Sequence, residues 1–197
     1  MNKSLMIFAL IFSCQLTAFE KLSDAYLVQY GNSQAELRIV QYFSFTCPHC
    51  VALFRKQFQQ IKEDYIETGK VSWVFHPVPM DLLTVQGMDC LSKLSEREKK
   101  IFLEAILEEL FIDQPKLSLQ LMQKGMEVLG KPIKELQEKA YLAETAAFHD
   151  SFHFLKQDQI IEALPSVDVN GKFLSAQVPD IDFIEELLRT TGRSHEN

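Results

Sequence analysis

Residues 43–54 read FSFTCPHCVALF and stand between two different apolar patterns. Residues 37–45 (LRIVQYFSF) are rich in β-branched and aromatic side chains, which is typical of a buried strand. From residue 48 to about residue 68, the apolar side chains recur at helical spacing. The pair Cys47 and Cys50 therefore falls where a predicted strand ends and a predicted helix begins.

The start of a helix changes the chemistry of a cysteine placed there. Cys47 can meet unpaired backbone N–H groups and the positive end of the helix dipole, and both stabilise the thiolate, which is the reactive form. Pro48 suits the first helical turn because its missing N–H costs little there, and His49 adds a donor and, when protonated, a positive charge. Cys50 lies on the same helical face and is expected to be the more buried thiol. The pattern predicts a redox couple in which Cys47 is the reactive sulfur.

A metal site and an inert structural disulfide are the alternatives for this pair. Structural zinc takes four ligands, commonly from two CxxC pairs or from one CxxC and two histidines. His76, His149 and His153 lack such a spacing to the cysteines, and a histidine pair four residues apart on a predicted helix is more typical of a solvated face. We therefore expect neither a metal nor another cofactor. Cys90 is interpreted as a buried, inert thiol, because free cysteine behaves as a small hydrophobe.

The composition limits the class of protein. The 197 residues suit one large domain or one domain with an insertion, and the hydrophobic content of 47% supplies a sizeable core. No apolar run reaches the roughly 18 residues that a membrane-spanning helix needs. The net charge is −7, and Lys and Arg are dispersed among acidic residues. We therefore expect no nucleic-acid partner.

Residues 1–18 have the layout of a secretory signal peptide. Lys3 gives a short positive region, residues 5–12 (LMIFALIF) are apolar without a break, and residues 16–18 (LTA) offer a cleavage site. An ordinary buried helix is one alternative, and a lipid anchor through Cys14 is another. We expect a periplasmic or otherwise extracytoplasmic protein. Such compartments are oxidising, so a thiol that stays free there has a function.

The remaining chain alternates between strand and helix patterns. Residues 25–30 and 71–76 are predicted to form strands, and residues from about 81 to 162 a block of helices. Asn170-Gly171 is a strong signal for a two-residue hairpin turn. A final amphipathic helix follows Asp180. The predicted order is strand, helix, strand, helical block, hairpin and helix.

Three features together resemble the DsbA family of thiol:disulfide oxidoreductases. They are the strand–CPHC–helix unit, the helical block, and Leu164-Pro165 shortly before the Asn170-Gly171 turn. The resemblance spans nearly all of the mature chain and implies an α/β structure, a thioredoxin fold with an inserted all-helical subdomain. It implies a thioredoxin-like domain at residues 19–80 and 160–197, and a helical insertion at residues 81–159.

The resemblance also implies roles outside the CxxC motif. Thioredoxin-like proteins are similar in placing a cis-proline against the CxxC, and Pro165 occupies the matching place, although a simple loop proline is the alternative. Leu164 would then present backbone groups to a substrate strand, because residues before proline favour extended geometry. Gln41 stands where DsbA-like proteins often have a glutamate, which leaves open how a proton reaches Cys50. His76 is interpreted as a packed histidine at a strand end.

A stabilised Cys47 thiolate is a good leaving group, so the disulfide is readily given away. We therefore expect an exported dithiol oxidase that forms a mixed disulfide on Cys47 with reduced or unfolded exported proteins. The resemblance implies a membrane partner that reoxidises it. A disulfide isomerase or reductase on the same fold, and a non-catalytic chaperone or peptide-binding module, are the alternatives. The segment between Ala18 and the first long strand is too short for the dimerisation domain of such isomerases, which favours a monomer.

Overall fold

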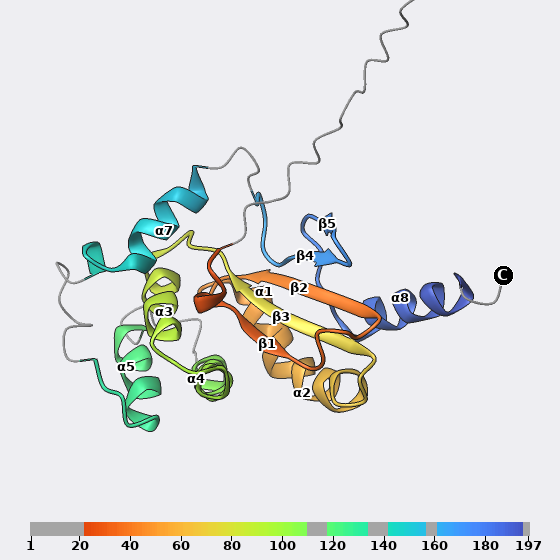
Figure 1. The fold of residues 1–197 in the computed structure, drawn as a ribbon, viewed down its shortest axis with the longest axis horizontal. Coiled ribbons are helices and arrows are strands. Elements are labelled where there is room, and N and C mark those ends of the chain that lie inside the picture. Colours follow the sequence, from red (N-terminus) through yellow and green to blue (C-terminus); the bar gives the residue numbers. More distant parts are fainter. Residues whose placement is uncertain (1–21, 110–117, 134–141, 157–160, 195–197) are drawn as a thin grey trace, which may run out of the picture.

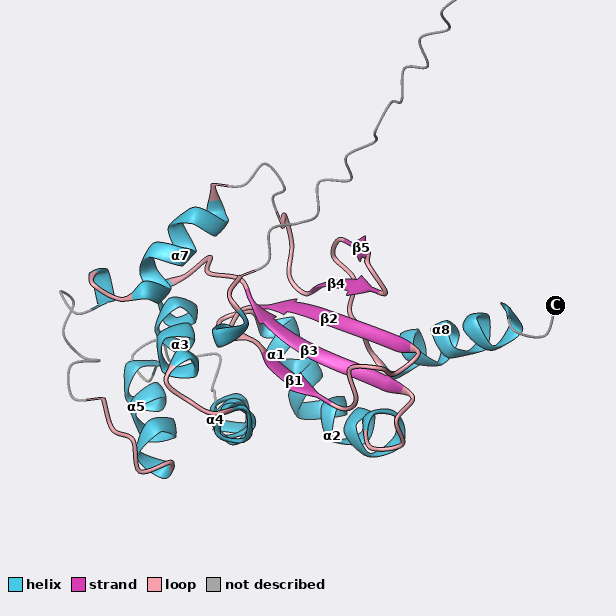
Figure 2. Cartoon of the chain, viewed as in Figure 1, coloured by secondary structure: helices cyan, strands magenta, loops and turns pink. Residues whose placement is uncertain are grey.

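The computed structural model describes residues 22–109, 118–133, 142–156 and 161–194 (Figure 1). Its centre is a mixed sheet with the strand order β1-β3-β2-β4-β5 (Figure 2). The strands are β1 (Val28–Tyr30), β2 (Leu37–Phe43), β3 (Val71–Pro77), β4 (Ser166–Val169) and β5 (Lys172–Leu174). β2 and β3 run parallel, and the other neighbouring pairs are antiparallel. The C-terminal ends of β2 and β3 therefore meet at one edge of the sheet.

Both faces of β2 are covered, because its side chains alternate between two apolar clusters. Leu37, Ile39 and Phe43 belong to the cluster that includes the helix after β2. Val40 and Tyr42 belong to the cluster on the opposite face. Burial on both faces explains the near-continuous apolar run in the sequence. The strand ends two residues earlier than predicted, because the chain turns there towards the helix.

The helix after β2 runs without interruption, but it is not α-helical throughout. Its segments are α1 (Pro48–Leu53), η2 (Phe54–Phe58), α2 (Gln59–Ile61) and η3 (Lys62–Ile66). η2 and η3 are π-helical, with wider turns than an α-helix. The predicted helix is confirmed, and Gly69 follows it with a φ of 79°, a backbone angle that glycine adopts without strain.

Between β3 and β4 the described chain is helical, as predicted. The helices are α3 (Leu82–Ser92), α4 (Glu96–Glu109), α5 (Ser118–Val128) and α7 (Ala146–Leu155). They gather at one side of the sheet (Figure 1), where α3 contacts α5 and α7, and α4 contacts β1. The Asp81 side chain caps α3, and the Thr145 side chain caps α7. The boundaries of the insertion at residues 81 and 159 stay a prediction.

The predicted strand at residues 25–30 is only partly correct. Asp24–Tyr26 forms a short 3₁₀ helix, η1, and the strand begins at Val28. The Tyr26 hydroxyl donates a hydrogen bond to Asp150 of α7 at 2.5 Å, so its side chain is directed at the helical block. The residues next to Tyr26 in the sequence give no indication of a contact with a partner 124 residues away.

The predicted hairpin and final helix are confirmed. Asn170 and Gly171 have φ angles of 50° and 88° and join β4 to β5, as a type I′ turn requires. α8 (Ile181–Ser194) follows and buries Ile184 in the core. Among the described helices, none is both long and apolar enough to cross a membrane. The predicted signal peptide at residues 1–18, which includes Cys14, lies outside the described residues.

Candidate active site

Cys47 lies at the N-terminus of α1, where the sequence predicts a strand-to-helix junction. It is the N-cap residue, with an extended backbone, and Pro48 takes the first helical turn. The backbone N–H of Cys47 donates to Ser44 O at 3.2 Å and closes the turn after β2. The backbone N–H of Cys50 donates to Cys47 Sγ at 3.4 Å. The sulfur of Cys47 therefore takes the place of the oxygen that caps many other helices.

The two thiols, both reduced in this structure, have opposite electrostatic environments. The pKa of Cys47 is lowered to about 6, chiefly by a hydrogen bond from the Cys50 thiol, against the effect of partial burial. Backbone N–H groups of Cys50 and His49 and the charge of His49 lower it further. The pKa of Cys50 is raised far above its usual range by its hydrogen bond to Cys47, by burial and by the Cys47 charge. Cys50 is the more buried thiol, as predicted, with an exposed fraction of 3%.

A loop far away in the sequence lies against Cys47. The Leu164–Pro165 peptide bond is cis. The Cys47 thiol lies 3.5 Å from Leu164 O and donates to it when protonated. The Ser166 hydroxyl donates to Ala163 O at 2.7 Å and accepts the Ala176 N–H at 3.0 Å, which holds this loop in shape. The carbonyl before the proline is thus within reach of the reactive sulfur, as the DsbA resemblance implies.

The structure brings the predicted site residues together. Pro48 and His49 are exposed on the first turn of α1, Cys47 is partly exposed, and Leu164 and Pro165 form the opposite side. The individual catalytic roles of these residues remain predictions.

A polar cluster beside the site was not predicted from the sequence. Asp81 Oδ2 accepts hydrogen bonds from Ser44 Oγ at 2.6 Å and Thr46 Oγ1 at 2.9 Å. The Thr84 hydroxyl of α3 donates a third hydrogen bond to the same oxygen, at 2.8 Å. Asp81 directly ahead of an apolar run is a helix-start signal. Its connection to the turn before Cys47 could not be inferred, because the partners are 37 and 35 residues away in the sequence.

Gln41 lies on β2, on the same side of the sheet as Ile39 and Phe43, which is the side that α1 covers. Its exposed fraction is 1%, and its Oε1 has no hydrogen-bond partner among the described residues. A buried amide does not titrate at ordinary pH. The structure therefore offers no proton carrier at this position.

His76 and Cys90 are buried in the core, as predicted. The His76 ring packs between Tyr42 and Phe154, and burial first, then the Asp89 charge, raises the pKa of Cys90 to about 12. A thiol with this pKa is unreactive at neutral pH. In the part of the chain that the structure describes, no three His, Cys, Asp or Glu side chains gather closely enough to bind a metal ion.

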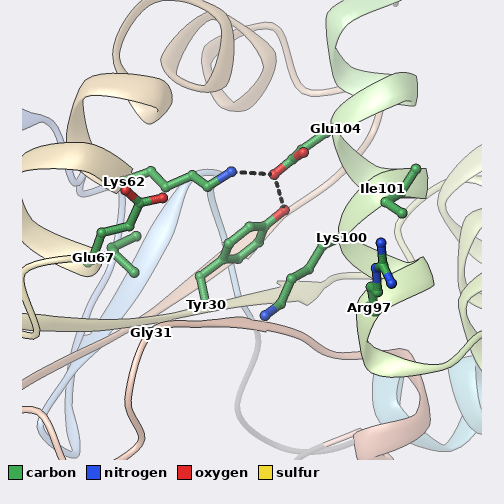
Figure 3. A pocket seen from close by; sticks show the side chains of 9 residues that line it. Tyr30, Gly31, Lys62, Glu67, Arg97, Lys100, Ile101 and Glu104 are labelled. Carbon is green, nitrogen blue, oxygen red and sulfur yellow. Dashed lines mark hydrogen bonds and ion pairs between the residues drawn. The ribbon is translucent and has the colours of Figure 1, made fainter.

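A separate hollow of about 410 Å³ lies near the other end of β3 (Figure 3). Tyr30 in its wall pairs with Trp73, in the first half of β3, whereas Cys47 follows the end of β2. Glu104 accepts hydrogen bonds from Tyr30 Oη at 3.1 Å and from Lys62 Nζ at 3.2 Å. These groups are engaged with one another, and the hollow has no thiol in its lining.

A reactive thiol at a strand–helix junction, opposite a cis-proline on a mixed sheet, defines a protein of the thioredoxin class. A family model described as Thioredoxin matches residues 24–187, which is more than half of the chain. The chain belongs to this family.

The relatives agree with this class. The chain is 39% identical over 69 residues to a protein of Rickettsia prowazekii (strain Madrid E) whose name proposes a protein-disulfide oxidoreductase. That match covers 35% of this chain and 24% of the relative, so the chain spans about a quarter of the length of that curated relative.

Two crystal structures show the same fold. Wolbachia pipientis alpha-DsbA1 matches with a TM-score of 0.63 at 20% identity, over 86% of this chain and 92% of that chain. A protein-disulfide isomerase from Novosphingobium aromaticivorans matches with a TM-score of 0.63 at 16% identity, over 84% and 97%. The thioredoxin fold with inserted helices is therefore confirmed.

Proposed function

We propose that this protein is an exported thiol:disulfide oxidoreductase that donates a Cys47–Cys50 disulfide to reduced proteins. The observation that carries the proposal is the contrast between the two thiols. Cys47 is partly exposed with a pKa of about 6, and Cys50 is buried with a raised pKa. The name of the Rickettsia relative supports the same chemistry.

The reaction follows from this contrast. A thiolate of the substrate attacks Cys47 Sγ of the disulfide, and Cys50 leaves as a thiolate and takes up a proton. The second substrate thiolate attacks the substrate sulfur of the mixed disulfide and expels the Cys47 thiolate. The substrate dithiol loses two electrons and two protons, and the protein disulfide becomes the dithiol. The membrane thiol-oxidising partner, proposed from the DsbA resemblance, then removes the two electrons.

The direction of electron flow follows from the stability of the reduced form. The Cys50 hydrogen bond and the backbone N–H groups that favour the Cys47 thiolate favour the reduced protein over its disulfide. A disulfide whose reduced form is stabilised is a strong oxidant. These contacts support an oxidase.

The cis-proline loop supports binding of an extended substrate. Leu164 O faces the reactive sulfur, so a substrate strand placed there would present its cysteine to Cys47. We propose Leu164 and Pro165 as substrate-binding residues and Pro48 and His49 as residues that tune the thiols. The proposed substrates are unfolded or reduced exported proteins, and the proposed working form is a monomer.

A disulfide isomerase or reductase is the second candidate. It is favoured by the structural match to a protein-disulfide isomerase, because the same fold carries that activity there. Both candidates need Cys47, whereas a chaperone or peptide-binding module does not.

The location is proposed from the N-terminal sequence. Cleavage after Ala18 would release the protein into the periplasm or another extracytoplasmic space, and acylation of Cys14 would instead anchor it to a membrane. The intact mass of the exported protein distinguishes the two, because an acylated chain begins at Cys14.

The activity is tested with a reduced, unfolded protein as substrate, an oxidised enzyme and the variants Cys47→Ser and Cys50→Ser. The wild type is expected to introduce disulfides stoichiometrically without an added oxidant, and Cys47→Ser to introduce none. If Cys47→Ser still promoted substrate folding as well as the wild type, a chaperone role would replace the proposal. If the wild type repaired only mispaired disulfides, an isomerase would replace it.

A further inference from the structure

The turn between β2 and α1 is held from outside by α3. This turn carries Ser44, Phe45 and Thr46 and leads directly into Cys47. Asp81, the N-cap of α3, and Thr84 hydrogen-bond to the turn. Gly87, further along α3, packs against Phe45. The contacts connect the helical block to the reactive thiol.

The polar contacts converge on one carboxylate. Asp81 Oδ1 accepts the Thr84 N–H at 2.8 Å and so caps α3. Asp81 Oδ2 accepts the hydroxyls of Ser44 at 2.6 Å and Thr46 at 2.9 Å. Oδ1 thus serves the helix alone, whereas Oδ2 binds the turn and also the Thr84 hydroxyl of α3. Hydrogen bonds to an ionised carboxylate are roughly twice as strong as neutral ones.

The turn is also fixed by hydrogen bonds of its own backbone. The Thr46 N–H donates to Ser44 Oγ at 3.0 Å, and the Phe45 N–H donates to Thr84 Oγ1 at 3.2 Å. Ser44 and Thr84 are buried, with exposed fractions of 3% and 0%. This network is buried at Ser44 and Thr84 and charge-assisted at Asp81, and it restrains the turn.

This turn positions both thiols. Ser44 O accepts the Cys47 N–H at 3.2 Å, and the backbone of Ser44 also donates a hydrogen bond that opposes the rise in the Cys50 pKa. The turn therefore sets where the sulfurs lie relative to the backbone N–H groups at the start of α1. Those groups stabilise a thiolate only when they are aligned with it.

We propose that Asp81 is a positioning residue for the redox centre, which holds the Ser44–Thr46 turn in the geometry that stabilises the Cys47 thiolate. The proposal rests on the proposed function and extends it, because it makes the helical block part of the redox centre. Asp81 acts on the sulfurs through its hydrogen bonds with Ser44 and Thr46.

The sign of the effect distinguishes positioning from a simple charge effect. The negative charge of Asp81 by itself disfavours a nearby thiolate, so removing it would lower the Cys47 pKa through the electric field. Loss of positioning has the opposite effect, because N–H groups that are no longer aligned stabilise the thiolate less. A rise in the Cys47 pKa therefore indicates positioning.

The test uses Asp81→Ser, because serine still caps a helix but has no second oxygen to reach the turn. Thr145→Ala is the matched control, since it removes the cap of α7 in the same helical block without touching the turn. The thiolate absorbance near 240 nm is measured against pH in the reduced proteins, and the equilibrium with glutathione is measured for each. Thermal unfolding of every variant reports whether it is folded.

Asp81→Ser is expected to raise the pKa of Cys47 by about half a unit or more, and to make the disulfide about threefold less oxidising. Thr145→Ala is expected to leave both quantities unchanged. Ser44→Ala removes the other partner of the Ser44–Asp81 hydrogen bond. It should shift the Cys47 pKa and the reduction potential in the same directions as Asp81→Ser. The double variant should shift them no further than the larger single change.

An unchanged or lowered pKa in both Asp81→Ser and Ser44→Ala would overturn the proposal. Equal shifts in Asp81→Ser and Thr145→Ala would also overturn it, because they would reflect lost helix stability alone. The proposed function is judged separately, from the reduction potential of the wild-type disulfide. A wild-type disulfide that is not oxidising would contradict the proposed oxidase. The differences between the variants and the wild type would still test the role of Asp81.

Discussion

At the scale of single residues, Cys47 and Cys50 form one electrostatic unit. Each supplies the largest cause of the other's pKa shift, and the directions are opposite. When Cys47 loses its proton, Cys50 keeps its own and donates it in a hydrogen bond to the Cys47 thiolate. This contrast explains how two identical side chains, three positions apart, acquire different chemical roles.

The lowered Cys47 pKa makes the stability of the reduced protein depend on pH. Its folded-state pKa of about 6 lies below its ordinary value of 9.0, so its contribution is fully present above pH 9 and is lost as the pH falls through 6. The reduced wild type is therefore expected to lose stability relative to Cys47→Ser between about pH 9 and about pH 6. Urea unfolding of both proteins across this range measures the difference. A difference that stays constant with pH contradicts the lowered pKa.

Gln41 is the second residue whose chemistry is open to test. Gln41→Glu introduces a carboxyl group into a buried place on the α1 side of the sheet, where burial raises its pKa. A carboxyl group at this position is the proton carrier that the DsbA resemblance implies for Cys50, so we expect thiol–disulfide exchange to become about three- to tenfold faster and more dependent on pH.

Gln41→Met is the matched control for that prediction, since methionine has a similar length and no exchangeable proton. Because Gln41 Oε1 already lacks a partner among the described residues, the methionine variant should keep its stability. Stopped-flow measurement of the reaction with a dithiol gives the rates. Equal rates in the glutamate and methionine variants at every pH would show that proton supply at this position has no effect.

At the scale of elements, the strand–helix unit was predicted well, because its signals are local. The apolar runs, the CPHC motif at the junction and the Asn170-Gly171 turn each need only neighbouring residues to be interpreted. Two features were missed for the opposite reason. The Tyr26 side chain, in the 3₁₀ helix, bonds to Asp150, and the turn before Cys47 is anchored by Asp81.

The contact between α3 and this turn gives a prediction for Gly87. A Cβ atom at Gly87 would lie 2.3 Å from a ring carbon of Phe45, closer than real Cβ contacts occur. Gly87→Ala is therefore expected to destabilise the protein by about 1–3 kcal/mol, despite the preference of helices for alanine. Urea unfolding measures it. Increased stability in the variant would show that Phe45 moves aside without cost and that α3 does not confine the turn.

At the scale of the whole molecule, the fold could be predicted because two distant motifs agreed. The CPHC motif and the Leu164-Pro165 pair are far apart in sequence, and the structure places Leu164 O 3.5 Å from Cys47 Sγ. What could not be predicted is how the helical block joins the site, since that depends on side chains that meet only after folding. The export signal and the insertion boundaries likewise stay predictions.

The activity proposed for the whole molecule is that the Cys47–Cys50 pair donates its disulfide to substrate proteins. The most direct test is its reduction potential, measured at pH 7 by equilibrium with glutathione. The lowered pKa of Cys47 predicts a potential above the thioredoxin value of about −270 mV, on the oxidising side of that protein. A potential close to that of thioredoxin would contradict an oxidase and identify a reductase.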